Sequence, residues 1–121
     1  QLPPREQAKL VRVIEGRVLD IAVDIRKSSA TFGNYIAVEL TAKNMRQLFI
    51  PSGFAHGFVV LSDSATFVYK VDNYYSVDHE RGIAFDDEKL KIDWKLSAKE
   101  LKLSAKDSQY PCLSESKDVF E

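Results

Sequence analysis

A regular alternation of side chains through the first seventy residues constrains the fold more than any other feature of the sequence. In segment 17–26, "RVLDIAVDIR", every second side chain is aliphatic, and these are Leu19, Ile21, Val23 and Ile25. The intervening side chains include two acids, and these are Val18, Asp20, Ala22 and Asp24. A period of two residues is typical of a β-strand that presents different side chains to its two faces.

Strand-like segments recur along this region and are separated by short turn signals such as "EGR", "TFGN", "PSG" and "SDS". The strand candidates are residues 8–14, 17–26, 35–41, 46–50, 53–62 and 65–72. Their number and spacing are typical of an antiparallel sandwich or barrel. No segment here carries the 3.6-residue stripe of an amphipathic helix. We therefore expect an all-β fold over the first two thirds of the chain.

The tail has a different pattern, because "LSAK" occurs twice within "LSAKELKLSAKD". Each copy contains a serine that suits a helix N-cap, followed three residues later by an acid. The pairs are Ser97 with Glu100 and Ser104 with Asp107. These features predict a short C-terminal helical segment, either one short helix or a pair of helical turns, the second of which Pro111 should end.

Length, charge and composition restrict the class of protein. A chain of 121 residues suits one domain with a single hydrophobic core. The formal net charge of −1 gives no reason to propose nucleic acid or an acidic membrane as a partner. No apolar run approaches the roughly 20 residues that a membrane helix needs. The single cysteine, Cys112, cannot form an internal disulfide, so we expect a reducing, cytoplasmic compartment.

Three titratable side chains fall on strand faces that are otherwise apolar. They are His56 with Phe54, Phe58 and Val60, Tyr69 with Ala65, Phe67 and Val71, and Lys9 with Val11 and Val13. Taken singly, each has a structural alternative, because such side chains can serve packing or reach solvent. Unpaired polar groups are nevertheless costly in an interior, and barrel mouths are common ligand sites. Together the three side chains predict a site inside the β structure.

The sequence argues against a metal centre. There is no His-x-His pair, and the second histidine, His79, lies in the polar stretch "VDHERG". Two isolated histidines and one cysteine do not make a tetrahedral or octahedral ligand set. The motifs G-x-S-x-G, G-x-x-x-x-G-K and G-x-G-x-x-G are absent as well.

Four stretches of the chain resemble the dTDP-4-dehydrorhamnose 3,5-epimerase family. They are "AKLVRVIEGRVLDIAVDIRKSSATFGNY", "LFIPSGFAHGFVVLSDSATFVYKVDNYYS", "ERGIAFDD" and "LSAKD" followed by "YPCL". The resemblance runs from Gln1 to about Leu113, and the blocks "PSGFAHGF" and "YKVDNYY" are its most specific parts.

The resemblance implies a cofactor-free, cupin-like jelly-roll protein that forms homodimers, here a single domain over residues 1–121 that lacks its N-terminal segment. It implies inversion of C3 and C5 of dTDP-4-keto-6-deoxy-D-glucose to give dTDP-4-keto-L-rhamnose, in dTDP-L-rhamnose synthesis. Both carbons are α to the C4 ketone. The reaction therefore needs a base, an acid, and a positive charge or donor near the ketone oxygen.

The resemblance also implies roles for single residues. Tyr69 corresponds to the family's proton donor, Lys9 to a lysine that stabilises the enolate, and His56 to a histidine that contacts the substrate. Asp107 corresponds to the aspartate that orients the basic histidine, although a helix-capping acid would give the same pattern. The substrate-binding positions are Tyr75, which corresponds to the tyrosine that stacks on thymine, and Glu80, Lys106 and Gln1.

The family's basic histidine belongs to a "GLHYQ" motif whose last residue aligns with Gln1, so it would lie two residues upstream. The chain begins at Gln1 and its only methionine is Met45, which predicts a fragment of a longer protein. We expect the fragment alone to be weak or inactive, because a general acid or base contributes about 10²- to 10⁴-fold. Two alternatives stay open, namely a dTDP-sugar 3,4-ketoisomerase and a non-catalytic sugar-binding cupin.

Overall fold

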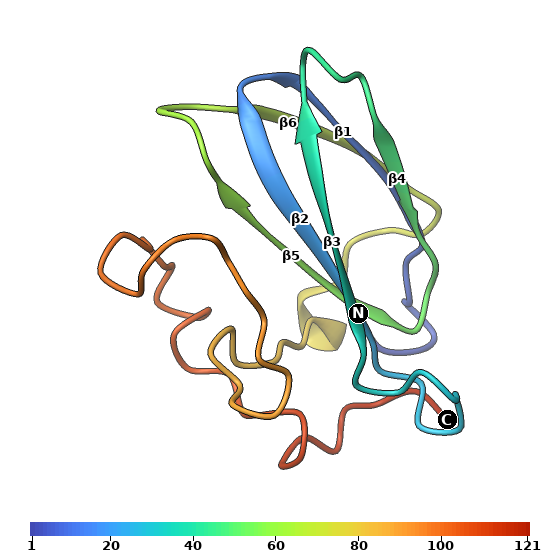
Figure 1. Ribbon diagram of the computed structural model, residues 1–121. Helices are drawn as coiled ribbons and strands as arrows, with labels where there is room; N and C mark the ends of the chain where they lie inside the picture. The colour runs from blue at the N-terminus through green and yellow to red at the C-terminus, as the bar shows by residue number, and fades with distance from the viewer.

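Six β-strands and one short helix make up the regular structure of the computed structural model, which describes residues 1–121 (Figure 1). The elements are β1 (Lys9–Glu15), β2 (Arg17–Asp24), β3 (Tyr35–Thr41), β4 (Gln47–Ile50), β5 (Phe54–Val60), β6 (Thr66–Val71) and the 3₁₀ helix η1 (Val77–His79). All six strands predicted from the alternation are confirmed, with ends that differ by at most two residues. The helix has three residues, so no helix of the protein is long enough to cross a membrane.

The strands form two antiparallel sheets of three strands each, in the orders β4-β1-β6 and β3-β2-β5. The predicted all-β fold is therefore confirmed. The chain passes from the first sheet to the second between β1 and β2, at Gly16, whose φ is +78°. A side chain there would also collide with the backbone oxygen of Ser64, because a Cβ would lie 2.2 Å from it. Glycine is thus required at this crossing for both backbone conformation and space.

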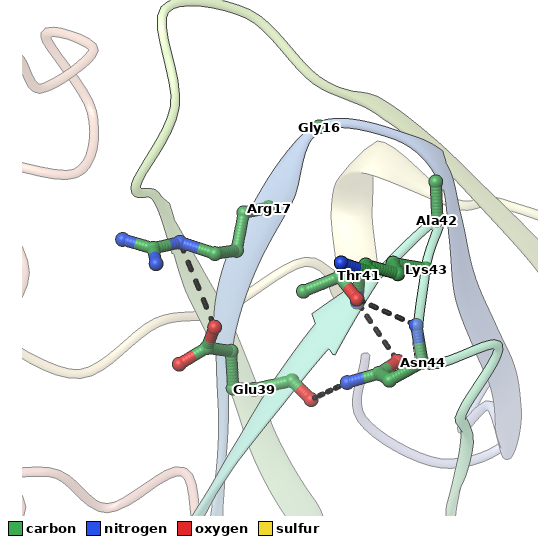
Figure 2. Close-up of a pocket in the computed structure, with 7 residues that line it drawn as sticks. All are labelled: Gly16, Arg17, Glu39, Thr41, Ala42, Lys43 and Asn44. Carbon is green, nitrogen blue, oxygen red and sulfur yellow. Dashed lines mark hydrogen bonds and ion pairs between the residues drawn. The ribbon is translucent and has the colours of Figure 1, made fainter.

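A shallow polar hollow lies at the same end of the sandwich, between the start of β2 and the turn after β3 (Figure 2). Several of its polar groups are already engaged with one another. Arg17 and Glu39 form an exposed ion pair with 3.6 Å between Nε and Oε1. The amide of Asn44 donates to the carbonyl of Glu39 at 3.0 Å, and its backbone N–H donates to the hydroxyl of Thr41 at 2.8 Å. None of the residues predicted for the site lies here.

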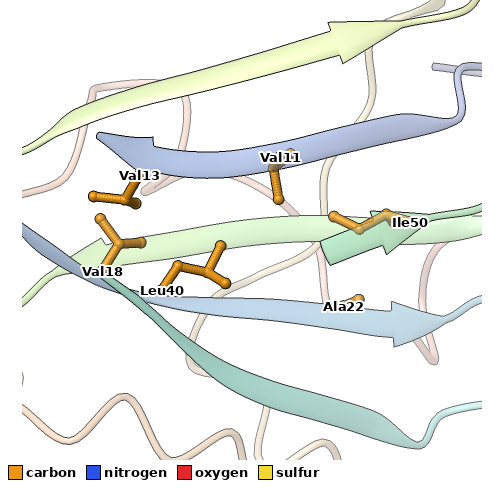
Figure 3. Close-up of a cluster of buried hydrophobic side chains, with 6 residues drawn as sticks. All are labelled: Val11, Val13, Val18, Ala22, Leu40 and Ile50. Carbon is orange, nitrogen blue, oxygen red and sulfur yellow. The ribbon is translucent and has the colours of Figure 1, made fainter. Parts of the chain in front are cut away.

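The hydrophobic core lies between the two sheets, where alternate side chains of each strand point inward (Figure 3). One sheet contributes Val11, Val13 and Ile50, and the other contributes Val18, Ala22 and Leu40. All six are at most 4% exposed. The face of β2 that carries the acids is therefore the inward face, and Asp20 and Asp24 enter the interior with its apolar side chains.

The outer faces of the two sheets differ. The outward aliphatic side chains of β2 are covered by the chain that follows η1, through a second cluster that includes Leu90 and Leu113. The outer face of β4-β1-β6 has no such cover. Three large apolar side chains on it are exposed, namely Ile14 at 46%, Phe49 at 62% and Val68 at 39%.

Buried Asp87 fixes the covering tail. Its Oδ1 accepts the backbone N–H groups of Lys89 and Leu90 at 2.8 and 3.2 Å, and its Oδ2 accepts that of Leu113 at 2.7 Å. The indole of Trp94 donates to the carbonyl of Phe85 at 2.8 Å. The tail therefore holds its path over the sheet through polar contacts to irregular backbone as well as through apolar packing.

Of the two forms predicted for this C-terminal segment, the structure has the pair of turns and not a continuous helix. The predicted capping contacts do form, since the carboxylate of Glu100 accepts the N–H and the hydroxyl of Ser97 at 2.8 Å each. Likewise the N–H of Asp107 donates to the hydroxyl of Ser104 at 3.2 Å. Each copy nevertheless stops at a single turn. Helix nucleation is costly, and no side chain between residues 97 and 109 is buried to offset that cost.

Candidate functional site

An aspartate and a histidine meet in the interior between the sheets. His56 on β5 is paired with Ala22 of β2, which places its ring on the inward face beside Asp20. The distance from His56 Nε2 to Asp20 Oδ1 is 2.5 Å, and the side chains are 11% and 0% exposed. Because a carboxylate is an acceptor only, the ring donates through Nε2, and Nδ1 remains available for another hydrogen bond. The inward position predicted for His56 is confirmed.

Asp20 was not among the predicted site residues, although the alternation placed it on the same face as Val18 and Ala22. An acid in phase with core residues was the signal that could have identified it. The buried Asp24 on the same strand differs, because Arg26 and the hydroxyls of Ser29 and Thr31 all donate to it. Oδ2 of Asp20 has no hydrogen-bond partner within the chain. Of the two acids, only Asp20 retains acceptor capacity in the interior.

Aromatic side chains connect His56 with the opposite sheet. Phe67 on β6 stacks on the ring of His56, with centroids 6.1 Å apart and an interplanar angle of 22°. Phe67 also stacks on Phe58 at 4.5 Å and lies 6.1 Å from Tyr69. The ring of Tyr69 thus lies at the edge of this aromatic group and remains open to solvent, since Tyr69 is 59% exposed.

Lys9 shares the inward face of its sheet with Tyr69. The register pairs Lys9 with Val71 and Val11 with Tyr69, so both side chains alternate in phase with the buried Val11. Burial is the largest influence on the Lys9 ammonium and lowers its pKa, while the negative charges of Asp20 and Glu80 act in the opposite direction. A partly desolvated ammonium near two carboxylates is suited to stabilise developing negative charge. Lys9, Asp20, His56 and Tyr69 are called the interior cluster below.

A second group of polar side chains lies in the irregular segments after β6. The hydroxyl of Tyr75 donates to Glu80 Oε2 at 2.9 Å, and Lys106 Nζ donates to Glu80 Oε1 at 2.7 Å. The bond from Lys106, followed by that from Tyr75, lowers the pKa of Glu80. The bond to Glu80 raises the pKa of Tyr75. One carboxylate therefore joins a phenol and an ammonium.

Gln1 contacts the same loop. Its side-chain oxygen accepts the backbone N–H of Ser76 at 2.8 Å, and its side-chain nitrogen donates to the carbonyl of Tyr74 at 3.1 Å. These bonds place Gln1 next to Tyr75. Gln1, Tyr75, Glu80 and Lys106 are called the rim cluster below. Lys9 lies within electrostatic range of Glu80 and so links the rim cluster to the interior cluster.

Asp107 is not brought into either cluster. It is exposed, and its recorded contact is made by its backbone N–H to Ser104. The capping role weighed for this residue is therefore observed at the N–H, while its carboxylate is not engaged with either cluster. The protein also has no group of three His, Cys, Asp or Glu side chains arranged to hold a metal ion.

Comparisons of the sequence with known proteins point to one family. A sequence model of the family described as dTDP-4-dehydrorhamnose 3,5-epimerase matches residues 1–115. The chain is 60% identical over 94 residues to a Shigella flexneri protein of that name, covering 78% of this chain and 52% of that protein. It is 45% identical over 112 residues to one from Methanothermobacter thermautotrophicus, covering 92% and 60%. The chain thus spans about half to three fifths of the length of these relatives.

Solved structures give the same result for the fold. The structure of dTDP-4-dehydrorhamnose 3,5-epimerase from Elizabethkingia anophelis superposes with a TM-score of 0.95 at 47% identity, covering 98% of this chain and 64% of that one. A Legionella pneumophila 3,5-epimerase in complex with dTDP-4-keto-L-rhamnose gives 0.89 at 46% identity, covering 93% and 59%. A 3'-monoepimerase from Streptomyces bikiniensis, in complex with dTDP-quinovose, gives 0.84 at 30% identity, covering 93% and 57%. These likenesses confirm the predicted cupin-like jelly-roll fold, and the chain belongs to the dTDP-4-dehydrorhamnose 3,5-epimerase family.

Proposed function

We propose that the protein to which this chain belongs converts dTDP-4-keto-6-deoxy-D-glucose to dTDP-4-keto-L-rhamnose in dTDP-L-rhamnose synthesis. The observation that carries the proposal is the interior cluster, in which the imidazole of His56 is bonded to Asp20 and the ammonium of Lys9 lies within electrostatic range of Asp20. The ring of Tyr69 lies beside Phe67, which stacks on His56. Membership of the family supports the proposal. So does the bound sugar nucleotide in the Legionella pneumophila relative.

The chemistry follows from the C4 ketone of the substrate. A base removes the proton from C3 or C5 and leaves an enolate, and an acid returns a proton to the opposite face. Lys9 would stabilise the enolate oxygen, because its ammonium is partly desolvated. Tyr69 would donate the proton from its phenol. Only acid–base groups are needed for these steps, so we propose no cofactor.

The remaining residues would bind the sugar nucleotide. His56 would hold a sugar oxygen within the interior, with Asp20 fixing the orientation of its ring through the 2.5 Å bond. Tyr75 would stack on thymine, and Glu80, Lys106 and Gln1 would line the rest of the nucleotide site. We assign the base to the histidine that the family resemblance places two residues before Gln1, with Asp107 as its partner. The bond between Tyr75 and Glu80 fixes the phenol that would stack on the nucleobase.

Proton exchange with solvent tests the reaction. The chain, extended upstream to include the "GLHYQ" segment, is incubated with the substrate in D₂O, and deuterium at each carbon is measured by NMR. We expect incorporation at C3 and C5 together with formation of the L-rhamno product. No incorporation at either carbon contradicts the proposal. Incorporation at C3 alone would assign the activity named for the Streptomyces bikiniensis relative.

Tyr69→Phe tests the proton donor separately. The variant retains the aromatic ring but not the ionisable hydroxyl, so proton removal by the base should continue. We expect deuterium exchange at C3 or C5 together with a loss of completed inversion of about 10²-fold or more. Unchanged epimerisation would remove Tyr69 from the mechanism.

The protein is further proposed to act as a cytoplasmic homodimer. The exposed apolar side chains on the outer face of β4-β1-β6, Ile14, Phe49 and Val68, support association through that sheet. Light scattering coupled to size-exclusion chromatography measures the mass directly. Phe49→Lys should shift that mass from dimer to monomer, whereas a wild-type protein that elutes as a monomer would contradict the proposal.

A further inference from the structure

Tyr110 lies directly against Gly82, and this contact joins two segments that are far apart in the sequence. If Gly82 carried a Cβ, that atom would lie 2.3 to 2.5 Å from Cε2, Cδ2 and Cζ of the Tyr110 ring. Such a distance is far below van der Waals contact. The ring therefore occupies the space above the glycine backbone that any other residue would fill with its own side chain.

Contacts on both sides of this one bring the same two segments together. Before it in the sequence, Lys106 Nζ donates to Glu80 Oε1 at 2.7 Å. After it, the backbone N–H of Ala84 donates to the carbonyl of Pro111 at 2.8 Å. Residues 80–84 thus run beside residues 106–111, with the packed ring between an ion pair and a backbone hydrogen bond.

We propose that Tyr110, packed on Gly82, is a positioning residue that holds Lys106 beside Glu80 in the nucleotide-sugar site. The inference rests on the proposed function for its ligand, a thymidine diphosphate sugar. Neither Tyr110 nor Gly82 belongs to the rim cluster itself. They act through the backbone that carries Lys106, and the ring is the contact that sets the distance between the two segments.

The exposure of the ion pair shows why a separate anchor is needed. The side chains of Lys106 and Glu80 are 58% and 30% exposed. An ion pair that is open to solvent does not fix two long side chains by itself, because the entropy lost in ordering them offsets most of the attraction. The turn that carries Lys106 also has no regular secondary structure. Ring packing on a glycine supplies the rigid contact that these residues lack.

Gly82→Ala is the most specific variant for testing this contact. The backbone of Gly82 does not have positive φ, so alanine adds a methyl group without backbone strain. Tyr110→Ala removes the ring from the other side. Tyr110→Phe is the conservative variant, because the contact is made by ring atoms that phenylalanine retains. Tyr74→Ala is the matched control, since Tyr74 is a tyrosine outside this contact and is 83% exposed.

The primary readout is the titration of the Glu80 carboxylate, measured by ¹³C NMR, because Lys106 is the largest cause of its lowered pKa. We expect the pKa of Glu80 to rise toward its ordinary value in Gly82→Ala and in Tyr110→Ala. It should stay low in Tyr110→Phe and in the control. An unchanged pKa in both Gly82→Ala and Tyr110→Ala would overturn the positioning role.

The second readout is the affinity for thymidine diphosphate, measured by calorimetry. Gly82→Ala should weaken binding about tenfold, as expected for loss of one charge-assisted contact. In a Lys106→Met background it should have no further effect, because the two changes act through the same ammonium. Additive losses would overturn the inference, since they would mean that the ring acts independently of Lys106. If wild-type protein bound no thymidine diphosphate, the proposed function would fail, while the Glu80 titration would still decide the contact.

Discussion

Two hydrogen-bonded side-chain pairs of similar length lie in two different regions of the candidate site. His56 and Asp20 are 2.5 Å apart on adjacent strands of one sheet, and their side chains are 11% and 0% exposed. Lys106 and Glu80 are 2.7 Å apart on irregular segments, and their side chains are 58% and 30% exposed. The comparison separates the geometry of a pair from its environment, because only the environment differs strongly.

The exposure of each pair to solvent should decide how much it contributes to the stability of the fold. Charges removed from water lose their hydration, so a buried pair must stay intact or one partner is left unpaired at high cost. Charges at the surface keep most of their hydration and are screened by salt. We therefore expect the His56–Asp20 pair to contribute strongly to stability and the Lys106–Glu80 pair to contribute little.

The largest expected effect is the loss of the interior partner in His56→Ala. The carboxylate of Asp20 would remain in the core with neither oxygen bonded. Breaking a buried pair in this way costs about 3–5 kcal/mol of unfolding free energy. Urea denaturation followed by tryptophan fluorescence measures the loss, since the protein has one tryptophan, Trp94.

The double variant His56→Ala with Asp20→Ala serves as the control for this effect. It should be more stable than His56→Ala alone, because no unpaired carboxylate is left in the core. A double variant that is less stable than the single one would show that the cost comes from lost packing. In that case the comparison between the two pairs would lose its basis.

Loss of Asp87, which holds the tail that carries Lys106, should lower the unfolding free energy by less than the loss of His56. Asp87→Ala leaves three backbone N–H groups of a buried segment without their acceptor, and we expect a loss of about 2 kcal/mol. Asp87 is 3% exposed. The loss should be accompanied by faster hydrogen exchange at the Leu113 amide, because that N–H donates to Asp87. Hydrogen exchange measured by NMR checks this second part.

The same residue predicts a dependence on pH. Burial alone would raise the pKa of Asp87, but the three N–H donors more than offset it and hold the pKa below its ordinary value. A lowered pKa in the folded state gives stability that is complete above the unfolded value, about 3.9. That stability is lost as the pH falls below about 4. Urea midpoints of wild-type protein and Asp87→Asn should therefore converge as the pH falls from 5 to 2.

The sequence was most informative where side chains alternate. The period of two residues identified all six strands and placed Lys9, His56 and Tyr69 on inward faces. It also placed Asp20 inward, but the pairing of Asp20 with His56 joins residues 36 positions apart. Such pairing depends on strand register, which the alternation of a single strand does not fix.

The tail was less predictable because its contacts have no period. Glu80 and Lys106 meet across 26 positions of irregular chain. The serine and acid pairs predicted a helix or a pair of helical turns, and they form their capping bonds within single turns. Local signals thus gave the correct local contacts, while the extent of the structure depended on burial that those segments do not have.

Lys9→Met should stabilise the protein, whereas His56→Ala and Asp87→Ala should destabilise it. Burial lowers the pKa of Lys9 more than the nearby carboxylates raise it, so the ammonium is less favourable in the folded state than in water. Methionine keeps much of the length without the charge. We expect the unfolding free energy to increase at pH 7, by about 0.5 kcal/mol. The gain should shrink as the pH rises toward 10.5, where the unfolded lysine also loses its charge. A destabilised variant at pH 7 would show that attraction to Asp20 and Glu80 outweighs burial.

The smallest expected effect on stability is that of Lys106→Met, which completes the comparison with the interior pair. Its partner Glu80 stays accessible to water and keeps the bond from Tyr75, so no unpaired buried charge results. The urea midpoint should shift only slightly at low ionic strength. The difference from wild type should disappear in 1 M NaCl, where the Debye length is about 3 Å. The deficit of His56→Ala should persist in the same salt, because a buried pair is screened much less. A Lys106→Met deficit that is equally insensitive to salt would mean that the rim pair behaves as a buried one, and the two pairs would then not differ in their electrostatic environment.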